Sequence, residues 1–152
     1  MKKNYFLLIF IIGCIMTLIL SSCATFTKVQ LSPEQALRQR VATYWEARIK
    51  GDPEGAYELL VPLARKAVSL GAYAKRTSSF KILDYRIESV SMGPDNKEAV
   101  VRVWRSFKIK SSAVPIRIDK VLEQTGESRW LLVKGKWYME YNLLPPPNFK
   151  ND

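Results

Sequence analysis

Hydrophobic residues recur at helical spacing in the segment that follows residue 31. Their positions lie three or four residues apart: Leu37, Val41, Tyr44, Trp45 and Ile49. A stripe of this kind is typical of an amphipathic helix that packs one face on a core. The positions between them are mostly charged or polar, so we expect the opposite face of the helix to meet solvent.

Short signals mark both ends of this helix. Ser32 and Gln35 have the S-x-x-Q spacing of a capping box, and Pro33 suits the first helical position. Gly51 is the residue type that most often follows the last helical turn. We therefore predict a helix from Pro33 to Lys50.

Three shorter helical segments are expected next. Asp52-Pro53-Glu54 repeats the same kind of start signal, and Pro62 interrupts the helix because its ring clashes with a continuing one. One more helical turn is predicted over residues 63–68. A last piece begins at Ser69, which can cap it, and runs through Arg76.

From residue 80 onward the hydrophobic period changes to two, which indicates strands. Turns are predicted at residues 93–96, 125–128 and 134–135, and a bulge near Lys120. The strands between them are expected at Phe80–Met92, Glu98–Lys110, Val114–Gln124, Arg129–Val133 and Lys136–Tyr141. Helices followed by four to five antiparallel strands define an α+β fold.

The first 22 residues have the layout of an export signal. Lys2 and Lys3 precede an uncharged apolar stretch over residues 5–20. The sequence Leu20-Ser21-Ser22-Cys23 then resembles the lipobox of bacterial lipoproteins. That resemblance implies cleavage before Cys23 and attachment of diacylglycerol, usually followed by acylation of the new amino group. It places the mature chain in the cell envelope, anchored to the membrane through Cys23.

Two alternatives remain for this segment. Ile11-Ile12-Gly13-Cys14 also fits a lipobox loosely, but cleavage there would leave an apolar stub on the mature chain. An uncleaved membrane helix needs about 20 apolar residues, and this stretch is shorter. Each version keeps the two lysines inside and the domain outside the cytoplasm. Ala24 is not Asp, so the lipoprotein sorting rule favours the outer membrane in an organism that has one.

The predicted domain organisation follows from these boundaries. Residues 1–22 form the signal peptide, 23–31 a short lipidated tether, 32–142 the α+β domain and 143–152 a Pro-rich tail.

Two segments of the domain, residues 44–60 and the strand-turn-strand of residues 129–138, resemble the nuclear transport factor 2-like superfamily, which includes ketosteroid isomerase. The resemblance implies a cone in which helices lie across a curved sheet and enclose a pocket.

Composition narrows the chemistry. Among 152 residues there is no His, which removes the common general base and His-based metal sites, and there are 2 Cys. Neither a cofactor nor a metal is expected, since Gly-rich phosphate loops and clustered metal ligands are absent from the sequence. These features favour a non-catalytic binding domain. The alternative is a pocket enzyme of the isomerase or dehydratase type that uses Asp84 or Asp119 on a strand.

Four residues are the candidates for such a pocket: Tyr44, Tyr57, Asp84 and Asp119. The tyrosines can donate hydrogen bonds to a ligand, and a carboxylate can act as a base. The alternative for each tyrosine is a packed ring with its hydroxyl at the surface. For Asp84 the alternative is a solvated carboxylate at a strand edge.

Positive charge exceeds negative charge, with a formal net charge of +10. Six cations lie on two neighbouring predicted strands: Arg102, Arg105, Lys108, Lys110, Arg117 and Lys120. An exported chain rarely meets nucleic acid, so that partner is excluded, and an anionic envelope surface is the third functional alternative. The partners expected besides the membrane are an envelope protein, a cell-wall polymer or a small apolar ligand. The oligomeric state stays open, and a merely soluble cationic surface is the simpler interpretation.

Overall fold

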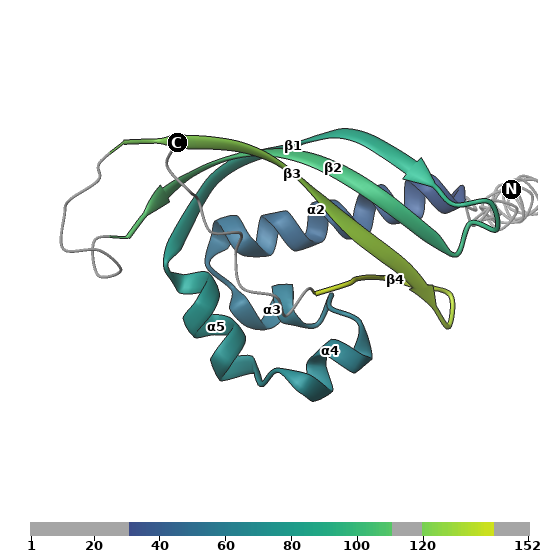
Figure 1. Cartoon of the computed structure of the whole chain (residues 1–152), viewed down its shortest axis with the longest axis horizontal. Coiled ribbons are helices and arrows are strands. Elements are labelled where there is room, and N and C mark those ends of the chain that lie inside the picture. Colours follow the sequence, from purple (N-terminus) through teal and green to yellow (C-terminus); the bar gives the residue numbers. More distant parts are fainter. Residues whose placement is uncertain (1–30, 111–119, 142–152) are drawn as a thin grey trace, which may run out of the picture. The chain divides into compact units, whose positions relative to one another are not determined.

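The computed structural model describes residues 31–110 and 120–141. Helices come first in the chain and strands follow (Figure 1). The helices are α2 (Pro33–Lys50), α3 (Pro53–Tyr57), α4 (Pro62–Ala67) and α5 (Leu70–Ser78). The strands are β1 (Phe80–Met92), β2 (Glu98–Ile109), β3 (Leu122–Val133) and β4 (Lys136–Met139).

The four strands form one antiparallel sheet in the order β1-β2-β3-β4. The sheet is curved, and α2 runs across its concave side while α3, α4 and α5 lie beyond it (Figure 1). The predicted α+β architecture of helices packed on a curved antiparallel sheet is therefore confirmed.

The predicted signals define α2. Ser32 Oγ accepts from the amide of Gln35 at 3.2 Å, and Gln35 Oε1 accepts from the amide of Ser32 at 2.9 Å. The reciprocal pair satisfies two amide groups at the helix start. Gly51 ends the helix with φ 73°, a left-handed conformation that costs glycine little because it has no Cβ.

The apolar stripe of α2 packs on the inner face of the sheet. Leu37 and Val41 are fully buried, as are Val101 and Trp130 on the sheet. The ring of Tyr44 meets Trp130 edge to face, with 6.4 Å between centroids. Burial of these side chains supplies the main stabilisation, at about 25 cal/mol per Å² of apolar surface removed from water.

Two irregularities bend β1. The pairing with β2 shifts between Ile82 and Asp84, and again between Ile87 and Ser89. An extra residue in one strand of an antiparallel pair kinks that strand and increases its twist. These shifts curl the sheet around α2 and keep Ile82 on the inside, where it is 4% exposed.

The prediction of a turn at residues 125–128 is wrong. These residues belong to β3, and Thr125 to Ser128 pair in register with Trp104 to Val101 of β2. Gly126 between polar neighbours resembles a turn in sequence, but its pairing with Val103 keeps the strand continuous. Residues 129–133 are thus the end of a long strand and not a separate one.

Other strand boundaries also differ. Lys120 precedes β3, so it is not a bulge within a strand, and the register shifts of the described chain lie in β1 instead. The final strand ends at Met139, two residues before the predicted end. Residues 114–119 of the predicted third strand lie outside the described residues.

Backbone hydrogen bonds join β4 to the segment between α3 and α4. Met139 donates to the carbonyl of Leu59 at 2.7 Å, and Val61 donates to the carbonyl of Met139 at 2.9 Å. The hydroxyl of Tyr57 lies 2.8 Å from the carbonyl oxygen of Arg65 and 2.7 Å from that of Val68. Pro62, predicted to interrupt the preceding helix, begins α4.

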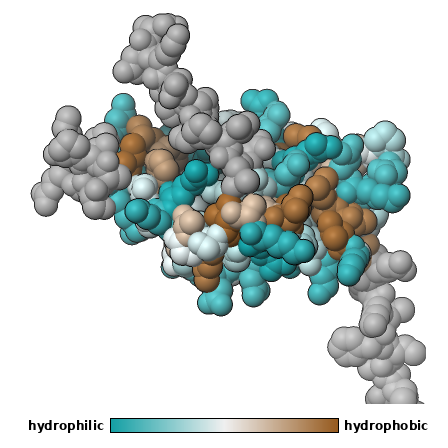
Figure 2. All heavy atoms as spheres, turned by 60° about the horizontal axis from the view of Figure 1, so that its bottom comes forward, coloured by the Kyte–Doolittle hydropathy of each residue, from teal (hydrophilic) through white to brown (hydrophobic). Residues whose placement is uncertain are grey.

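The side that carries the short helices shows hydrophobic side chains in several groups separated by hydrophilic ones (Figure 2). Leu63 of α4 is the most exposed large hydrophobic residue of the described chain, at 77%. The others are spread along the chain and do not share one element: Leu31, Leu70, Phe80, Val100 and Val121. Single exposed apolar residues are common on soluble domains and mark no binding face by themselves.

Among residues 31–110 and 120–141 there is no helix long and apolar enough to cross a bilayer. The predicted signal segment, Cys14 and Cys23 lie outside the described residues. The lipid anchor therefore stays a prediction from the sequence.

Candidate functional site

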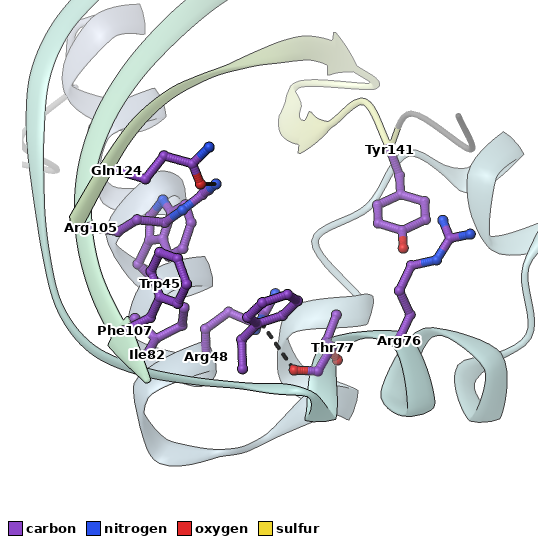
Figure 3. A pocket seen from close by; sticks show the side chains of 10 residues that line it. Trp45, Arg48, Arg76, Thr77, Ile82, Arg105, Phe107, Gln124 and Tyr141 are labelled. Atoms are coloured by element: carbon purple, nitrogen blue, oxygen red, sulfur yellow. Dashed lines mark hydrogen bonds between the residues drawn. The ribbon is translucent and has the colours of Figure 1, made fainter. Parts of the chain in front are cut away.

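A cavity of about 210 Å³ lies between α2, α5 and the concave face of the sheet (Figure 3). Side chains from six segments of the chain line it: Trp45, Arg48, Arg76, Thr77, Phe80, Ile82, Arg105, Phe107, Gln124 and Tyr141. Aromatic and aliphatic groups make most of the wall. Three arginines supply its charge, and no carboxylate is among the described lining residues.

Arg48 reaches the cavity from the last turn of α2. Its Nη1 donates to the hydroxyl of Tyr44 at 3.3 Å, and its Nη2 donates to the carbonyl of Thr77 at 3.5 Å. The hydroxyl of Tyr73, which is fully buried, donates to the same Tyr44 oxygen at 3.3 Å. The two tyrosines thus orient Arg48 from behind the cavity wall.

The pKa values of this group reflect its burial. Burial raises the pKa of the Tyr73 hydroxyl, and Tyr44 raises it further by charge repulsion and hydrogen bonding. Burial opposes the charge of Arg48, but Tyr44 and Tyr73 together raise its pKa above the ordinary value. Arg48 therefore stays charged at neutral pH.

Arg105 enters from β2 on the opposite wall. Its Nη2 donates to Oε1 of Gln124 at 2.7 Å, and its guanidinium lies 5.6 Å from the ring centroid of Trp45. Burial lowers the pKa of Arg105, and repulsion from Arg48 lowers it further. The charge of Tyr44 raises this pKa but does not offset the burial. An arginine still keeps its proton at neutral pH, so Arg105 carries a partly desolvated charge.

The remaining wall comes from α5 and the end of the described chain. Arg76 and Tyr141 stand together across the cavity from Arg105 and Gln124 (Figure 3). The ring of Tyr141 packs edge to face on Tyr73, with 5.5 Å between centroids. These contacts place a cation and a phenol at the rim that faces Arg105.

Comparison with known proteins identifies the fold but not the family. No protein-family model and no curated protein matches the sequence. Among solved structures, an NTF-2 like protein of unknown function from Shewanella oneidensis MR-1 matches with a TM-score of 0.53 and 15% identity, over 71% of this chain and 94% of that one. The chain has the nuclear transport factor 2-like fold.

Two further solved structures match the fold of this chain. A protein from Novosphingobium aromaticivorans DSM 12444, provisionally assigned as a scytalone dehydratase, matches with a TM-score of 0.50 and 18% identity, over 70% of this chain and 78% of that one. A SEC-C motif containing protein from Rhodopseudomonas palustris matches with a TM-score of 0.53 and 18% identity, over 72% of this chain and 76% of that one. The fold thus occurs with different functional assignments, and function must be argued from the site.

The structure describes three of the four candidate pocket residues and places them in different environments. Tyr44 is buried behind Arg48, and its hydroxyl is inside the domain and not at the surface. The Tyr57 hydroxyl donates to carbonyls of the α4 segment, and Tyr57 is not part of the wall of the arginine-lined cavity. Asp84 is exposed, and its Oδ1 accepts from the amide of Tyr85 at 2.8 Å. Asp119 lies outside the described residues.

The six candidate cations do not form one surface. Neighbouring strand residues point to opposite faces, so Arg105 lines the cavity while Arg102 and Lys108 lie on the outer face. Arg102 is exposed and pairs with Glu88 at 3.3 Å. Lys110 and Lys120 are exposed at the ends of β2 and β3, and Arg117 lies outside the described residues.

The sequence did not single out Arg48, Arg76 and Gln124 as a group. Arg48 lies in the last turn of α2, a usual place for a cation, and Arg76 lies at the predicted end of the last short helix. Only the packing of α2 and α5 against the sheet brings them near Arg105. The absence of a partner carboxylate at helical spacing on α5 is the one local signal that could have marked Arg76.

A second depression, of about 710 Å³, lies between α2, α4 and the β4 hairpin. Its cations include Arg40, whose Nε donates to the carbonyl of Trp137 at 3.1 Å, and Glu58 supplies a carboxylate to the same depression. Arg65 lines it as well, and its buried Nε has no hydrogen-bond partner among the described residues. We take the arginine-lined cavity as the candidate site because its wall is mainly aromatic and aliphatic and three cations converge on it with no carboxylate in the described lining.

Acidic and thiol groups do not cluster as metal ligands within residues 31–110 and 120–141. The lining groups of the cavity can bind in three ways. Guanidinium groups donate to anions, aromatic rings pack on apolar surface, and the Gln124 and Tyr141 side chains can hydrogen-bond a polar group. The arrangement is suited to hold a small molecule with both an apolar and a polar part.

Proposed function

We propose that this chain is a lipid-anchored protein of the cell envelope whose NTF2-like domain binds a small ligand without transforming it. The cavity between α2, α5 and the sheet carries this proposal. Its described lining binds and orients but offers no carboxylate to act as a base, and an arginine does not release its proton at neutral pH.

The alternative of an isomerase or dehydratase requires a carboxylate in the pocket. Asp84, one of the two strand carboxylates available for that role, is exposed and bonded to its own strand. This position favours the binding function over catalysis. The relative provisionally assigned as a dehydratase shares the fold at 18% identity and lends no residue-level support to an enzyme.

The anchor rests on the lipobox-like segment. Two or more acyl chains at Cys23 hold a protein durably on a membrane, whereas one chain binds reversibly. Ala24 after the modified cysteine favours the outer membrane in an organism that has one. In this proposal the domain presents its cavity outside the cytoplasm and close to the bilayer.

Blocking the cavity tests the binding function. The full chain, purified in a nonionic detergent, is titrated calorimetrically with naphthalene sulfonate, and protein-free micelles give the background. Thr77→Trp places an indole into the cavity from α5, and we expect it to abolish saturable binding. Lys75→Trp adds the same group to an exposed position of the same helix and is the matched control.

The wild type and Lys75→Trp should bind one probe per chain. Equal binding by Thr77→Trp would place the probe elsewhere and contradict the proposed site. Thermal unfolding of both variants shows whether the domain has kept its fold. If Thr77→Trp does not fold, Thr77→Leu narrows the same wall with less strain and is expected to weaken binding.

A further inference from the structure

Three guanidinium groups from three different elements converge on one cavity. Arg48 comes from α2, Arg76 from α5 and Arg105 from β2 (Figure 3). Like charges repel, so bringing them together around a small volume costs free energy in the empty protein. An anion between them would remove that cost and gain charge-assisted hydrogen bonds.

The partners of the cavity arginines in the described chain are neutral. Arg48 donates to a phenol and a carbonyl, and Arg105 donates to the amide oxygen of Gln124. No carboxylate among the described residues forms an ion pair with either of them or with Arg76.

Several arginines elsewhere in the domain pair with carboxylates. Arg38 pairs with Glu34 at 2.8 Å. Arg129 lies between Glu98 and Glu140. The exposed Arg102 and Arg129 thus have carboxylate partners, although screening makes such pairs worth little, whereas the half-buried Arg48 and Arg105 have none among the described residues. An omission at that point leaves the negative charge to be supplied by a ligand.

The other walls define the rest of the ligand. Trp45, Phe80 and Phe107 offer aromatic surface, and the buried Ile82 adds aliphatic surface. The rings of Phe80 and Phe107 meet edge to face at 5.6 Å. A cavity volume of about 210 Å³ is the volume that roughly seven water molecules occupy in liquid water. This is below the ~300 Å³ at which pockets for drug-sized molecules begin, so the apolar part must be small.

We infer that the cavity binds a small organic anion, in which an apolar body of one or two rings or a short chain carries a carboxylate-like head. Arg48 and Arg105 hold the head, Arg76 closes on it from the rim, and the aromatic wall packs on the body. This inference rests on the proposed binding function and specifies the class of its ligand.

Three probes with one ring system and different charge test it. Naphthalene carboxylate, naphthalene methanol and naphthylmethylammonium are titrated calorimetrically into the full chain in nonionic detergent, with protein-free micelles as reference. We expect the carboxylate to bind at least tenfold more tightly than the alcohol, and the ammonium not to saturate. Inorganic phosphate should compete weakly, because it has no apolar body.

Arg105→Gln should lower the affinity for naphthalene carboxylate roughly tenfold to a hundredfold, since one charge-assisted hydrogen-bonded pair is lost. It should leave the affinity for naphthalene methanol almost unchanged. Arg102→Gln is the matched control, because it removes the same charge from the outer face of the same strand. Arg76→Gln, on an exposed helix position, should cost a few-fold and tests the site without touching the core.

The outcomes separate the two proposals. Equal affinity for carboxylate and alcohol, or an equal effect of Arg102→Gln and Arg105→Gln, would overturn the anion preference while leaving a ligand-binding cavity. No saturable binding of any probe would contradict the proposed function itself. Phosphate that competes as strongly as the carboxylate would show an inorganic-anion site and overturn the role of the aromatic wall.

Discussion

At the scale of single residues, the hydroxyl of Tyr73 shows how the site and the stability of the domain are coupled. The ring is fully buried between α2 and the end of the described chain, and its hydroxyl donates to Tyr44. Tyr44 in turn accepts from Arg48. The pair of tyrosines that orients Arg48 is therefore part of the core. Ionisation of the Tyr73 hydroxyl would disturb both the core and the orientation of Arg48.

This coupling predicts a dependence of stability on alkaline pH. Burial raises the pKa of Tyr73 above its ordinary value of 10.0, so the native state keeps the proton where the unfolded chain loses it. The stabilisation that the Tyr73 hydroxyl contributes is fully present below pH 10.0. It declines as the pH rises from there toward the higher pKa of the native state. Urea unfolding across alkaline pH measures the decline.

Tyr73→Phe should lose about 1 kcal/mol at neutral pH, because the hydrogen bond to Tyr44 disappears. The variant should also lose less stability than the wild type on moving to alkaline pH, since it has no hydroxyl to ionise. Parallel curves for the two proteins would contradict the assigned role of Tyr73. Ultraviolet absorbance of tyrosinate, followed in the same titration, shows whether the native hydroxyl resists ionisation.

At the scale of elements, two glycines on helices offer a matched test of backbone conformation. A Cβ added at Gly51 or at Gly71 would meet nothing within 4 Å, so neither substitution causes a clash. Gly51 ends α2 with φ 73°, whereas Gly71 lies inside α5 without a positive φ. The same change therefore acts on the backbone alone.

Gly51→Ala should destabilise the domain by about 1 kcal/mol, because an L-residue is strained in the left-handed conformation. Gly71→Ala should stabilise it by roughly 0.4–1 kcal/mol, because alanine restricts the unfolded chain and favours helix. Urea midpoints of the two variants and the wild type decide the signs. Equal effects would mean that the end of α2 is not held in the conformation described.

The elements that could be predicted from the sequence are those with local causes. The capping box and Gly51 are short-range signals, and α2 begins and ends where they stand. The continuity of β3 through Gly126 has a distant cause, since pairing with Val103 decides it. The bends of β1 have the same origin, because a register shift depends on the partner strand and leaves no mark in its own residues.

The cavity depends even more on distant contacts. Aromatic residues at helical spacing were correctly expected to form a core, and the family resemblance implied a pocket. Which residues line it depends on the angle between α2, α5 and the sheet. Arg48 and Arg105 are far apart in the sequence and meet only after the sheet curls, so no local pattern could join them.

At the scale of the whole molecule, the predicted lipid anchor would decide where the cavity acts. Cys23 and Cys14 are the 2 cysteines of the chain, and each stands in a lipobox-like segment. They offer a matched pair of substitutions in the full chain. Metabolic labelling with a radioactive fatty acid in a bacterial host should give a labelled band for the wild type and for Cys14→Ala, but not for Cys23→Ala.

The two outcomes lead to different molecules. If Cys23 carries the lipid, cleavage before it would remove the two lysines with the signal peptide and leave a short tether, which would keep the cavity near the headgroups. Label that follows Cys14 would keep an apolar segment on the mature chain. Mass spectrometry of the purified wild type adds an independent test: an unmodified Cys23 with the first 22 residues still attached would mean a membrane-spanning anchor, and the proposal of a lipid-anchored protein would be wrong.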